Sequence, residues 1–278
     1  MQIIFHEIHH LLLHQTLHSF DYSKQLFLLD GRFIGVYNHT RLFNECESNT
    51  THQKYYTFLF FIKMKFRKYW RKTSLKKEID GNYLLNHIKQ AKPKNFLEIG
   101  VFHGVTSRNV CEMLYLLHGN GFKFTGVDWF SHELGSKDDY IPKTNFSNPL
   151  KTVYYNYIIR LNPYSYQSVL KLLKKFEKNI NIIKGNSNKI LKEIPIIFDY
   201  VFLDGGHKYE TIKNDLKNLT QVINNGGIIL CDDYNLSYAP GVKKAIDDYV
   251  LEKNFNLKIL NSRFAEITKL TNFLEPLA

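Results

Sequence analysis

The chain has 278 residues, 44% of them apolar, which is enough for one large domain or for one domain with an appendage. Lys and Arg exceed Asp and Glu by 11, and this excess favours polyanionic neighbours such as nucleic acid or an anionic membrane face. The three cysteines have no paired spacing, so a disulfide framework or a cysteine zinc site is disfavoured and a reducing compartment fits better: Cys46, Cys111 and Cys231.

Apolar runs in the sequence are too short to span a bilayer, for which about 20 residues are needed. The run at 55–62 is the most apolar, and the N-terminus lacks the basic region and small-residue cleavage site of a signal peptide. We therefore expect a cytoplasmic protein, and contact with an anionic membrane surface stays open.

Residues 1–77 lack regular strand and helix patterns and are expected to form an appendage of unknown function. The stretch "HEIHH" at 6–10 formally matches the helical zinc-protease pattern. No preceding chain can supply the usual supporting sheet, so we favour a peripheral histidine-rich helix, or a true translation start at Met64.

A basic run, "KMKFRKYWRKTSLKK", follows at 63–77 and holds eight Lys or Arg residues with aromatic residues between them. A solvated linker helix is the favoured interpretation. The alternative is a patch that binds phosphate or lipid headgroups.

Strands and helices alternate regularly over residues 78–278, which we expect to form one α/β domain. Short apolar strands separated by helices are typical of a mostly parallel, doubly wound Rossmann-like sheet. The expected helices are 78–91, 107–119, 186–194, 207–223 and 241–254, and the expected strands are 95–100, 122–130, 179–185, 198–206, 226–234, 257–262 and 264–270.

An insertion at about 129–180 interrupts this alternation and includes an apolar helix at 164–178. Connections in such domains are usually only a few residues plus one helix. The insertion either covers the active site and selects the substrate or is merely structural, and the sequence leaves both open.

Acidic residues end four of the expected strands: Glu98, Asp128, Asp204, and Asp232 with Asp233. The carboxyl ends of parallel strands meet at one edge of the sheet, where open α/β sheets bind ligands. Helix capping explains one such acid but hardly four together. We therefore expect a ligand site at this edge.

The first turn, "EIGVFHG", does not suit a dinucleotide, because it has only Gly100 and Gly104 and because Glu98 would repel a pyrophosphate. A cationic or hydroxyl-rich ligand fits better. Asp128, 28 residues after Gly100, is placed like an acid that accepts hydrogen bonds from ribose hydroxyls. A nucleoside with a positive group in place of phosphates meets both conditions, and S-adenosylmethionine is such a molecule.

The successive stretches "FLEIGVFHGVTS", "FTGVDWF", "IIKGNS", "FDYVFLDGGHKYETIKNDL" and "GGIILCDDYNLSYAPGVKKAIDDYV" resemble the motifs of class I S-adenosylmethionine-dependent methyltransferases. The resemblance covers about residues 80–270 and points to the branch of macrocin-type sugar O-methyltransferases. It implies a seven-stranded sheet of order 3-2-1-4-5-7-6 with one antiparallel strand. The first motif departs from the common one in reading G-x-x-x-G.

By this resemblance, Glu98, Gly100 and Gly104 bind the methionine part of the cofactor, Asp128 the ribose, and Asn186 and Ser187 the adenine. In related sugar and catechol O-methyltransferases, acids at the later strand ends hold a divalent metal. Oxygen ligands of this kind suit Mg²⁺, and the candidates here are Asp204, Asp232 and Asp233.

His207 is the candidate catalytic base, because it follows Asp204, the other candidate catalytic residue, by three positions and because histidine titrates near neutral pH. The structural alternative is that these acids only organise loops and that His207 caps the next helix.

The leading hypothesis is therefore an O-methyltransferase that acts on a sugar or other small polyol, with Mg²⁺ as an additional cofactor left open. An RNA or DNA methyltransferase and a non-catalytic S-adenosylmethionine-binding scaffold are the alternatives. The acceptor and any homo-oligomeric state cannot be read from the sequence.

Overall fold

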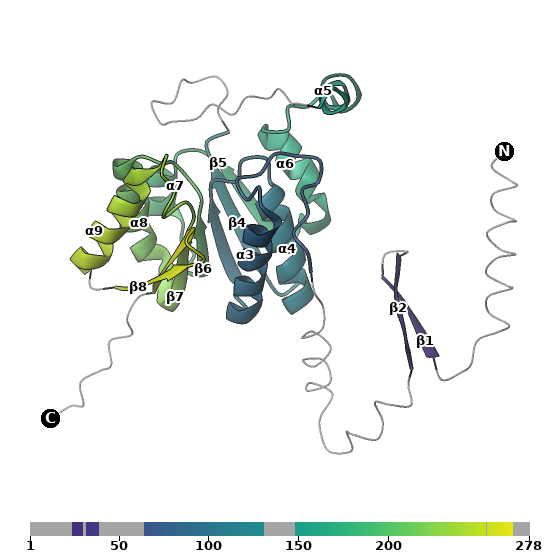
Figure 1. Ribbon diagram of the computed structural model, residues 1–278, viewed down its shortest axis with the longest axis horizontal. Coiled ribbons are helices and arrows are strands. Elements are labelled where there is room, and N and C mark those ends of the chain that lie inside the picture. The colour runs from purple at the N-terminus through teal and green to yellow at the C-terminus, as the bar shows by residue number, and fades with distance from the viewer. Residues whose placement is uncertain (1–23, 30–31, 39–63, 131–147, 254, 269–278) are drawn as a thin grey trace, which may run out of the picture. The chain divides into compact units, whose positions relative to one another are not determined.

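The computed structural model describes residues 24–29, 32–38, 64–130, 148–253 and 255–268, and the chain divides into two compact units, 1–62 and 63–278 (Figure 1). In the first unit, strands β1 (Lys24–Leu29) and β2 (Arg32–Asn38) pair in antiparallel fashion. The histidine-rich stretch at 6–18 lies outside the described residues.

The second unit contains one seven-stranded sheet with the strand order β5-β4-β3-β6-β7-β9-β8, which confirms the predicted order and the Rossmann-like fold class. Strands β3 to β7 are parallel, and β9 runs antiparallel to both of its neighbours. The strands are β3 (Asn95–Ile99), β4 (Lys123–Asp128), β5 (Ile180–Lys184), β6 (Phe198–Leu203), β7 (Ile223–Cys231), β8 (Asn256–Leu260) and β9 (Phe264–Thr268).

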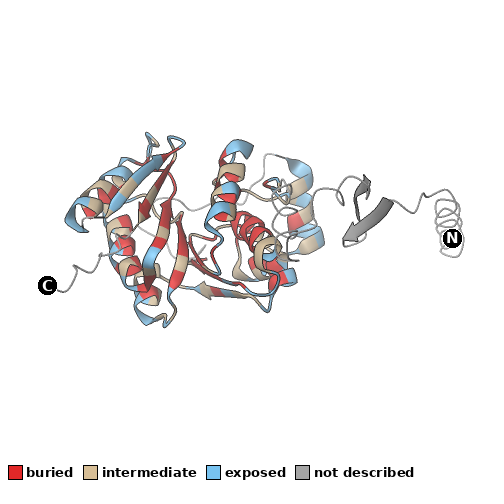
Figure 2. Cartoon of the chain, turned by 90° about the horizontal axis from the view of Figure 1, so that it is seen from below, coloured by how far each residue is buried: buried red, intermediate tan, exposed pale blue. Residues whose placement is uncertain are grey.

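Helices cover both faces of this sheet, and each face has its own buried core (Figures 1 and 2). Side chains of α3, α4 and α6 pack on one face, and those of α7, α8 and α9 on the other. Helices α3 and α4 are Glu78–Ala91 and Val105–His118, and the remaining four are α6 (Tyr166–Leu173), α7 (Ser187–Glu193), α8 (Tyr209–Val222) and α9 (Pro240–Lys253).

The side chains of β3 point alternately to the two faces of the sheet and so contribute to both cores. Phe96 packs in the core under α3 and α4, while its neighbour Leu97 packs in the core under α8, as the period of two of a β-strand requires. Phe96 also stacks on Tyr200 of β6, with ring centroids 5.0 Å apart. Glu98 therefore points to the same face as Phe96, toward helix α4.

Segment 64–77 forms no helix, so the predicted linker helix is wrong. It packs on the rest of the second unit through Phe66 and Leu75, which are buried, and the compact unit accordingly begins at 63 rather than at 78. Arg71 donates hydrogen bonds to the backbone oxygens of His103 and Pro163 and to Ser168. This basic residue is therefore committed to internal contacts rather than to an outside phosphate.

The described parts of the insertion, 129–130 and 148–180, contain four short helical elements before β5. They are α5 (Pro149–Val153), the π-helical turn η2 (Tyr154–Ile159) and α6, and α6 continues as the 3-10 turn η3 (Lys174–Phe176). The helix expected at 164–178 is thus shorter, and Ser165 caps its start by accepting a hydrogen bond from the Ser168 backbone N–H. Among the described residues, no helix is long and apolar enough to cross a membrane.

Candidate active site

The four strands that end in acidic residues are adjacent in the sheet, in the order β4, β3, β6 and β7. Backbone hydrogen bonds hold their ends at one level: Asp204 N–H donates to Ile99 O, and Asp232 N–H donates to Leu203 O, each at 2.9 Å. Because these strands are parallel, the acids lie along one edge of the sheet.

Glu98 is completely buried, and only one of its carboxylate oxygens has a partner. Oε2 accepts a hydrogen bond from the Ser107 hydroxyl of α4, whereas Oε1 is buried without a hydrogen-bond partner. Burial raises the pKa of Glu98 to about 8, and the nearby Asp128 charge contributes to the rise. A buried acceptor that lacks a donor is costly, so this position fits a ligand that carries a positive group.

Asp128 ends β4 and is held by three donors. Its Oδ2 accepts from the backbone N–H of Phe102 at 2.7 Å, and its Oδ1 accepts from the N–H of Phe130 at 2.8 Å and from the Tyr164 hydroxyl at 3.1 Å. A carboxylate offers about four acceptor positions. The contacts fix the orientation of Asp128, as a residue that accepts a hydrogen bond from a ribose hydroxyl requires.

Gly100 and Gly104 both adopt backbone conformations with positive φ, of +94° and +73°. A Cβ on Gly100 would lie 1.9 Å from the backbone oxygen of Asp204, so only glycine permits this close approach. Gly104 is the N-cap of α4. The predicted first turn therefore packs directly against the end of β6.

Asn186 and Ser187, predicted to lie near adenine, form the start of α7. The Asn186 side chain accepts a hydrogen bond from the Asn188 N–H at 2.8 Å, and the Ser187 hydroxyl donates to Asp215 at 2.6 Å. Both side chains thus have structural partners, and their role toward adenine stays a prediction.

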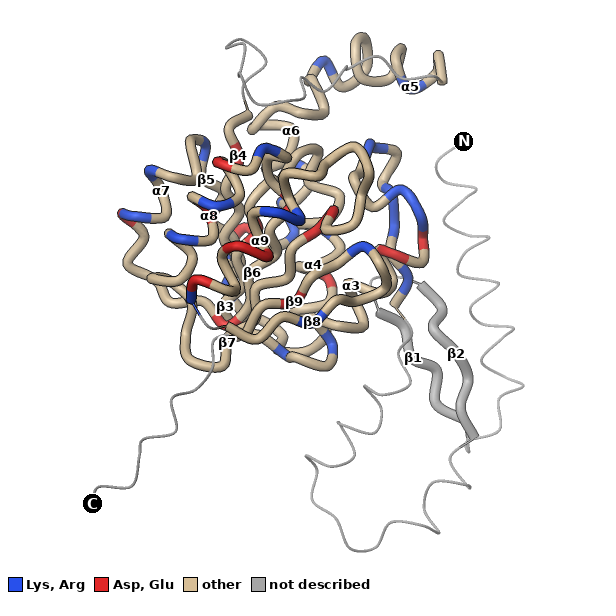
Figure 3. Tube along the Cα trace, turned by 60° about the vertical axis from the view of Figure 1, so that its left-hand side comes forward, with Lys and Arg blue, Asp and Glu red and all other residues tan. Residues whose placement is uncertain are grey.

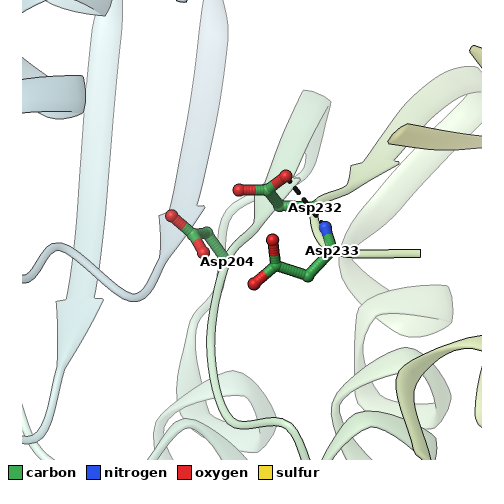
Figure 4. Close-up of side chains that lie close together, drawn as sticks. All are labelled: Asp204, Asp232 and Asp233. Carbon is green, nitrogen blue, oxygen red and sulfur yellow. Dashed lines mark hydrogen bonds between the residues drawn. The ribbon is translucent and has the colours of Figure 1, made fainter. Parts of the chain in front are cut away.

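The acidic cluster consists of Asp204, Asp232 and Asp233, with one carboxylate oxygen from each lying within 4.8 Å of the others (Figure 4). Asp233 has a φ of +60°, and its backbone N–H donates to Asp232 Oδ1 at 2.8 Å. Burial, together with the charges of Asp232 and Asp233, raises the pKa of Asp204 well above its usual range.

Two residues that the sequence reasoning missed contact this cluster. The Ser74 hydroxyl of segment 64–77 donates to Asp204 Oδ2 at 2.5 Å. Arg263, in the turn between β8 and β9, donates to both oxygens of Asp232, from Nε at 2.5 Å and from Nη2 at 2.7 Å. Neither residue lies near its partner in the sequence, so no motif spacing could have found it.

A divalent cation is the group that the predicted metal site would hold. The cluster offers the right atom type, because Mg²⁺ prefers carboxylate oxygens. Both oxygens of Asp232 already bind a guanidinium, and Asp233 Oδ1 lies 3.0 Å from the same group. The side chains as arranged therefore do not fit a metal ion unless Arg263 leaves.

His207 lies at the same carboxyl-end edge of the sheet, which we call the rim. Its Nε2 is 3.0 Å from Asp233 Oδ2, and its side chain is 30% exposed. The Tyr238 ring meets it edge-on, with centroids 5.8 Å apart. The capping position of α8 is occupied by Lys208, so the alternative role of His207 as a helix cap is wrong. A partly exposed imidazole held by a carboxylate is suited to accept a proton.

Comparison with known proteins agrees with this fold. Residues 97–234 match the family described as a methyltransferase domain. The match covers just under half of the chain and, together with the sheet order 3-2-1-4-5-7-6, is consistent with a class I S-adenosylmethionine-dependent methyltransferase.

Among solved structures, a methyltransferase from Podospora anserina, PaMTH1, is similar to this chain with a TM-score of 0.51 and 14% identity, over 80% of this chain and 99% of that one. A putative caffeoyl-CoA O-methyltransferase from Staphylococcus aureus gives 0.50 and 14%, over 80% and 93%. At these identities the likeness concerns the fold alone. A short match of 64 residues at 34% identity, to the uncharacterized protein R132 of Acanthamoeba polyphaga mimivirus, spans 23% of this chain and 29% of that protein.

Proposed function

We propose that this protein transfers a methyl group from S-adenosylmethionine to a hydroxyl group of a sugar or other small polyol. The observation that carries the proposal is the His207–Asp233 pair, which places a partly exposed base on the acid-lined rim of a methyltransferase fold. The acceptor hydroxyl is a poor nucleophile at neutral pH and benefits from such a base.

Residues of the first turn and of β4 would hold the cofactor. Glu98 Oε1, buried without a hydrogen-bond partner, would bind the amino group of the methionine part, and Asp128 would accept from a ribose hydroxyl. Asn186 and Ser187 lie at the start of α7, where the motif resemblance assigns the adenine. When bound, the cofactor supplies a methyl group on a positively charged sulfur.

His207 would take the proton of the acceptor hydroxyl. A neutral imidazole that donates from Nε2 to Asp233 carries its basic lone pair on Nδ1. The acceptor oxygen would gain the methyl group as the bound cofactor gave it up with loss of the carbon–sulfur bond, and His207 would accept the hydroxyl proton. Asp233 orients the ring and stabilises the imidazolium, and the rim aligns the two reactants.

Binding of a divalent metal ion at the acidic cluster stays a prediction, and the contacts of Arg263 argue against it. Asp232, which that hypothesis makes a metal ligand, is engaged by the guanidinium through both of its oxygens. The proposed transfer therefore depends on His207 for the proton and needs no step through a metal ion.

Exposed aromatic residues next to the rim support a sugar or polyol as acceptor. Trp129 directly follows Asp128 and is 44% exposed, and Tyr238 lies against His207 and is 69% exposed. Small-molecule sites are commonly lined by aromatic side chains with a few polar groups that fix orientation. A hydroxyl-bearing ring could rest on these side chains while its hydroxyl meets His207.

Nucleic acid is the weaker choice of acceptor. Lys and Arg are concentrated in segment 64–77, but they also occur on α5, α7, α8 and α9 and so do not form one basic element alone (Figure 3). The guanidinium of Arg71 in that segment points into the protein and donates hydrogen bonds to Ser168. A nucleic-acid methyltransferase would bind RNA or DNA with a steep dependence on salt.

Methyl transfer from labelled S-adenosylmethionine to a panel of sugars, lipids and RNA tests the proposal, together with calorimetric titration of the cofactor. We expect cofactor binding and label transfer to a hydroxyl-bearing small molecule. Tight cofactor binding with no transfer to any acceptor would favour the scaffold alternative. Label found only in RNA would contradict the proposed substrate class.

A further inference from the structure

Arg263 lies outside the span that matches the methyltransferase-domain family, 97–234, yet its guanidinium reaches the centre of the rim. Its side chain is 15% exposed. Besides binding both oxygens of Asp232, it lies 3.0 Å from Asp233 Oδ1 and 3.6 Å from Asp80 Oδ2. One guanidinium therefore faces three carboxylates, two from the residues that follow β7 and one from α3.

Two backbone features fix the position of Arg263: the turn that precedes it and a hydrogen bond to its own carbonyl. Asn261 and Ser262 have φ values of +50° and +53° and form the tight turn between β8 and β9. Two adjacent left-handed residues suit the turns of β-hairpins. The carbonyl of Arg263 accepts a hydrogen bond from the Tyr234 N–H at 2.9 Å, which ties the hairpin to the residue after the acidic cluster.

The charges explain why the side chain stays there. Carboxylates this close together repel one another, and taking them out of water without a countercharge is costly. A two-pronged contact between guanidinium and carboxylate is among the strongest ion pairs in proteins. Arg263 thus supplies to Asp232 and Asp233 the positive charge that a bound metal ion would otherwise bring.

A divalent cation at the same place would have to displace it. Mg²⁺ requires oxygen ligands at about 2.0–2.1 Å in near-octahedral geometry, and both oxygens of Asp232 are already hydrogen-bonded to Arg263. Asp204 Oδ2 is likewise bonded to the Ser74 hydroxyl. A cation placed among these acids would also lie beside a fixed positive charge.

We propose that Arg263 is the resident countercharge of the Asp204–Asp232–Asp233 cluster and that this site binds no divalent metal ion. The inference depends on the proposed function only in calling the cluster part of the methyl-transfer site. Arg263 acts as a positioning residue: it holds Asp232 and Asp233 in place, and Asp233 in turn holds His207.

Mn²⁺ binding, followed by the electron paramagnetic resonance signal of the unbound ion, tests the proposal without any methyl acceptor. We compare the wild-type chain with Arg263→Gln, which removes the charge but keeps a hydrogen-bonding side chain, and with Arg263→Lys, which keeps the charge. Lys244→Gln is the matched control, because it removes a positive charge from a side chain that is 71% exposed on α9.

We expect no Mn²⁺ binding by the wild type or Lys244→Gln up to about 1 mM, and binding at least about tenfold tighter by Arg263→Gln. Adding Asp232→Asn to Arg263→Gln should abolish the gain, and Arg263→Lys should behave like the wild type. Wild-type binding that Asp232→Asn removes would overturn the proposal. If Arg263→Gln does not fold, the wild-type and Asp232→Asn measurements still decide between the two outcomes.

Methyl transfer provides a separate readout. We expect EDTA to leave wild-type turnover unchanged, and an EDTA-sensitive turnover restored by Mg²⁺ would contradict the proposal. If no acceptor is methylated at all, the proposed function fails while the Mn²⁺ titration still decides the role of Arg263.

Discussion

The two halves of the rim are built in different ways. In the cofactor half, the partners of Glu98 and Asp128 lie no more than 36 residues away: the Ser107 hydroxyl is 9 residues from Glu98, and the donors Phe102, Phe130 and Tyr164 are 26, 2 and 36 residues from Asp128. The acid half comprises Asp204, Asp232 and Asp233 with their partners. Here Ser74 and Asp204 are 130 residues apart in the chain, and the Arg263 guanidinium donates to the carbonyl of Ser74, which is 189 residues away.

This difference separates two physical tasks. The cofactor half leaves a buried acceptor on Glu98 without a protein partner and so keeps a place for a cationic ligand. In the acid half, Arg263 supplies a positive charge, Ser74 and His207 supply hydrogen bonds, and Asp233 Oδ1, which has no hydrogen-bond partner among the described residues, lies 3.0 Å from the Arg263 guanidinium. We therefore expect substitutions in the first half to change cofactor affinity and substitutions in the second half to change turnover.

The largest effect is expected from His207→Ala. Loss of a general base lowers turnover by about 10²- to 10⁴-fold, while cofactor affinity should stay within about twofold because His207 belongs to the acid half. Steady-state kinetics and calorimetric cofactor titration measure the two quantities. Unchanged turnover would remove His207 from the mechanism, and a parallel loss of cofactor affinity would break the division between the halves.

Asp128→Ala should have the next largest effect, on the cofactor alone. The loss of a charge-assisted hydrogen bond worth about 1.5–3 kcal/mol predicts about 10- to 100-fold weaker S-adenosylmethionine binding. Asp199→Ala offers a matched control, because its carboxylate contacts backbone N–H groups of Lys94 and Asn95 at the opposite end of β3. Equal affinities in the wild type and in Asp128→Ala would contradict the assignment of Asp128 to the ribose.

Glu98 predicts a pH dependence of cofactor binding. Its pKa is raised to about 8, so the carboxyl is mostly protonated at pH 6 and must lose its proton to attract a cation. Affinity should therefore rise between pH 6 and 7.5, by up to about tenfold per pH unit. Calorimetry at several pH values should show this rise in the wild type and a flat, weak profile in Glu98→Gln.

The raised pKa of Glu98 also predicts that the stability of the ligand-free protein decreases with pH, whereas cofactor affinity increases. Because the folded protein holds this proton more tightly than the unfolded chain does, stability without ligand falls as pH rises from about 4.5 toward 8. Glu98→Gln should remove that loss and raise the melting temperature at pH 8 by several degrees. A lower melting temperature in Glu98→Gln would mean that the buried carboxyl stabilises the fold instead.

The smallest effect is expected from Ser74→Ala, which removes the hydroxyl bound to Asp204. Leaving a buried acceptor without its donor costs about 1–3 kcal/mol, which corresponds to a few degrees in melting temperature. Cofactor affinity should not change, because Ser74 belongs to the acid half. Thermal unfolding and cofactor titration of the same variant check both statements.

The sequence alone determined the order of strands and helices and which strands end in acid. Hydrophobic patterns are local: the short apolar run in "NFLEI" and helical spacing in "EIDGNYLLNHIKQA" identify β3 and α3, and the helix bounds 78–91 are those of the structure. The parallel arrangement then brings Glu98, Asp128, Asp204 and Asp232 to one edge, and the motif resemblance supplied the strand order.

Only the tertiary structure decided what neutralises the acids. Segment 64–77 has the composition of a solvated basic helix, yet it packs on the sheet domain and presents Ser74 to Asp204. Arg263 follows a two-residue turn near the end of the described chain, and nothing in its neighbourhood marks it as a partner of Asp232. Periodicity and motif spacing report neighbours along the chain, whereas these contacts depend on how distant segments pack, and that packing is set by the whole core at once.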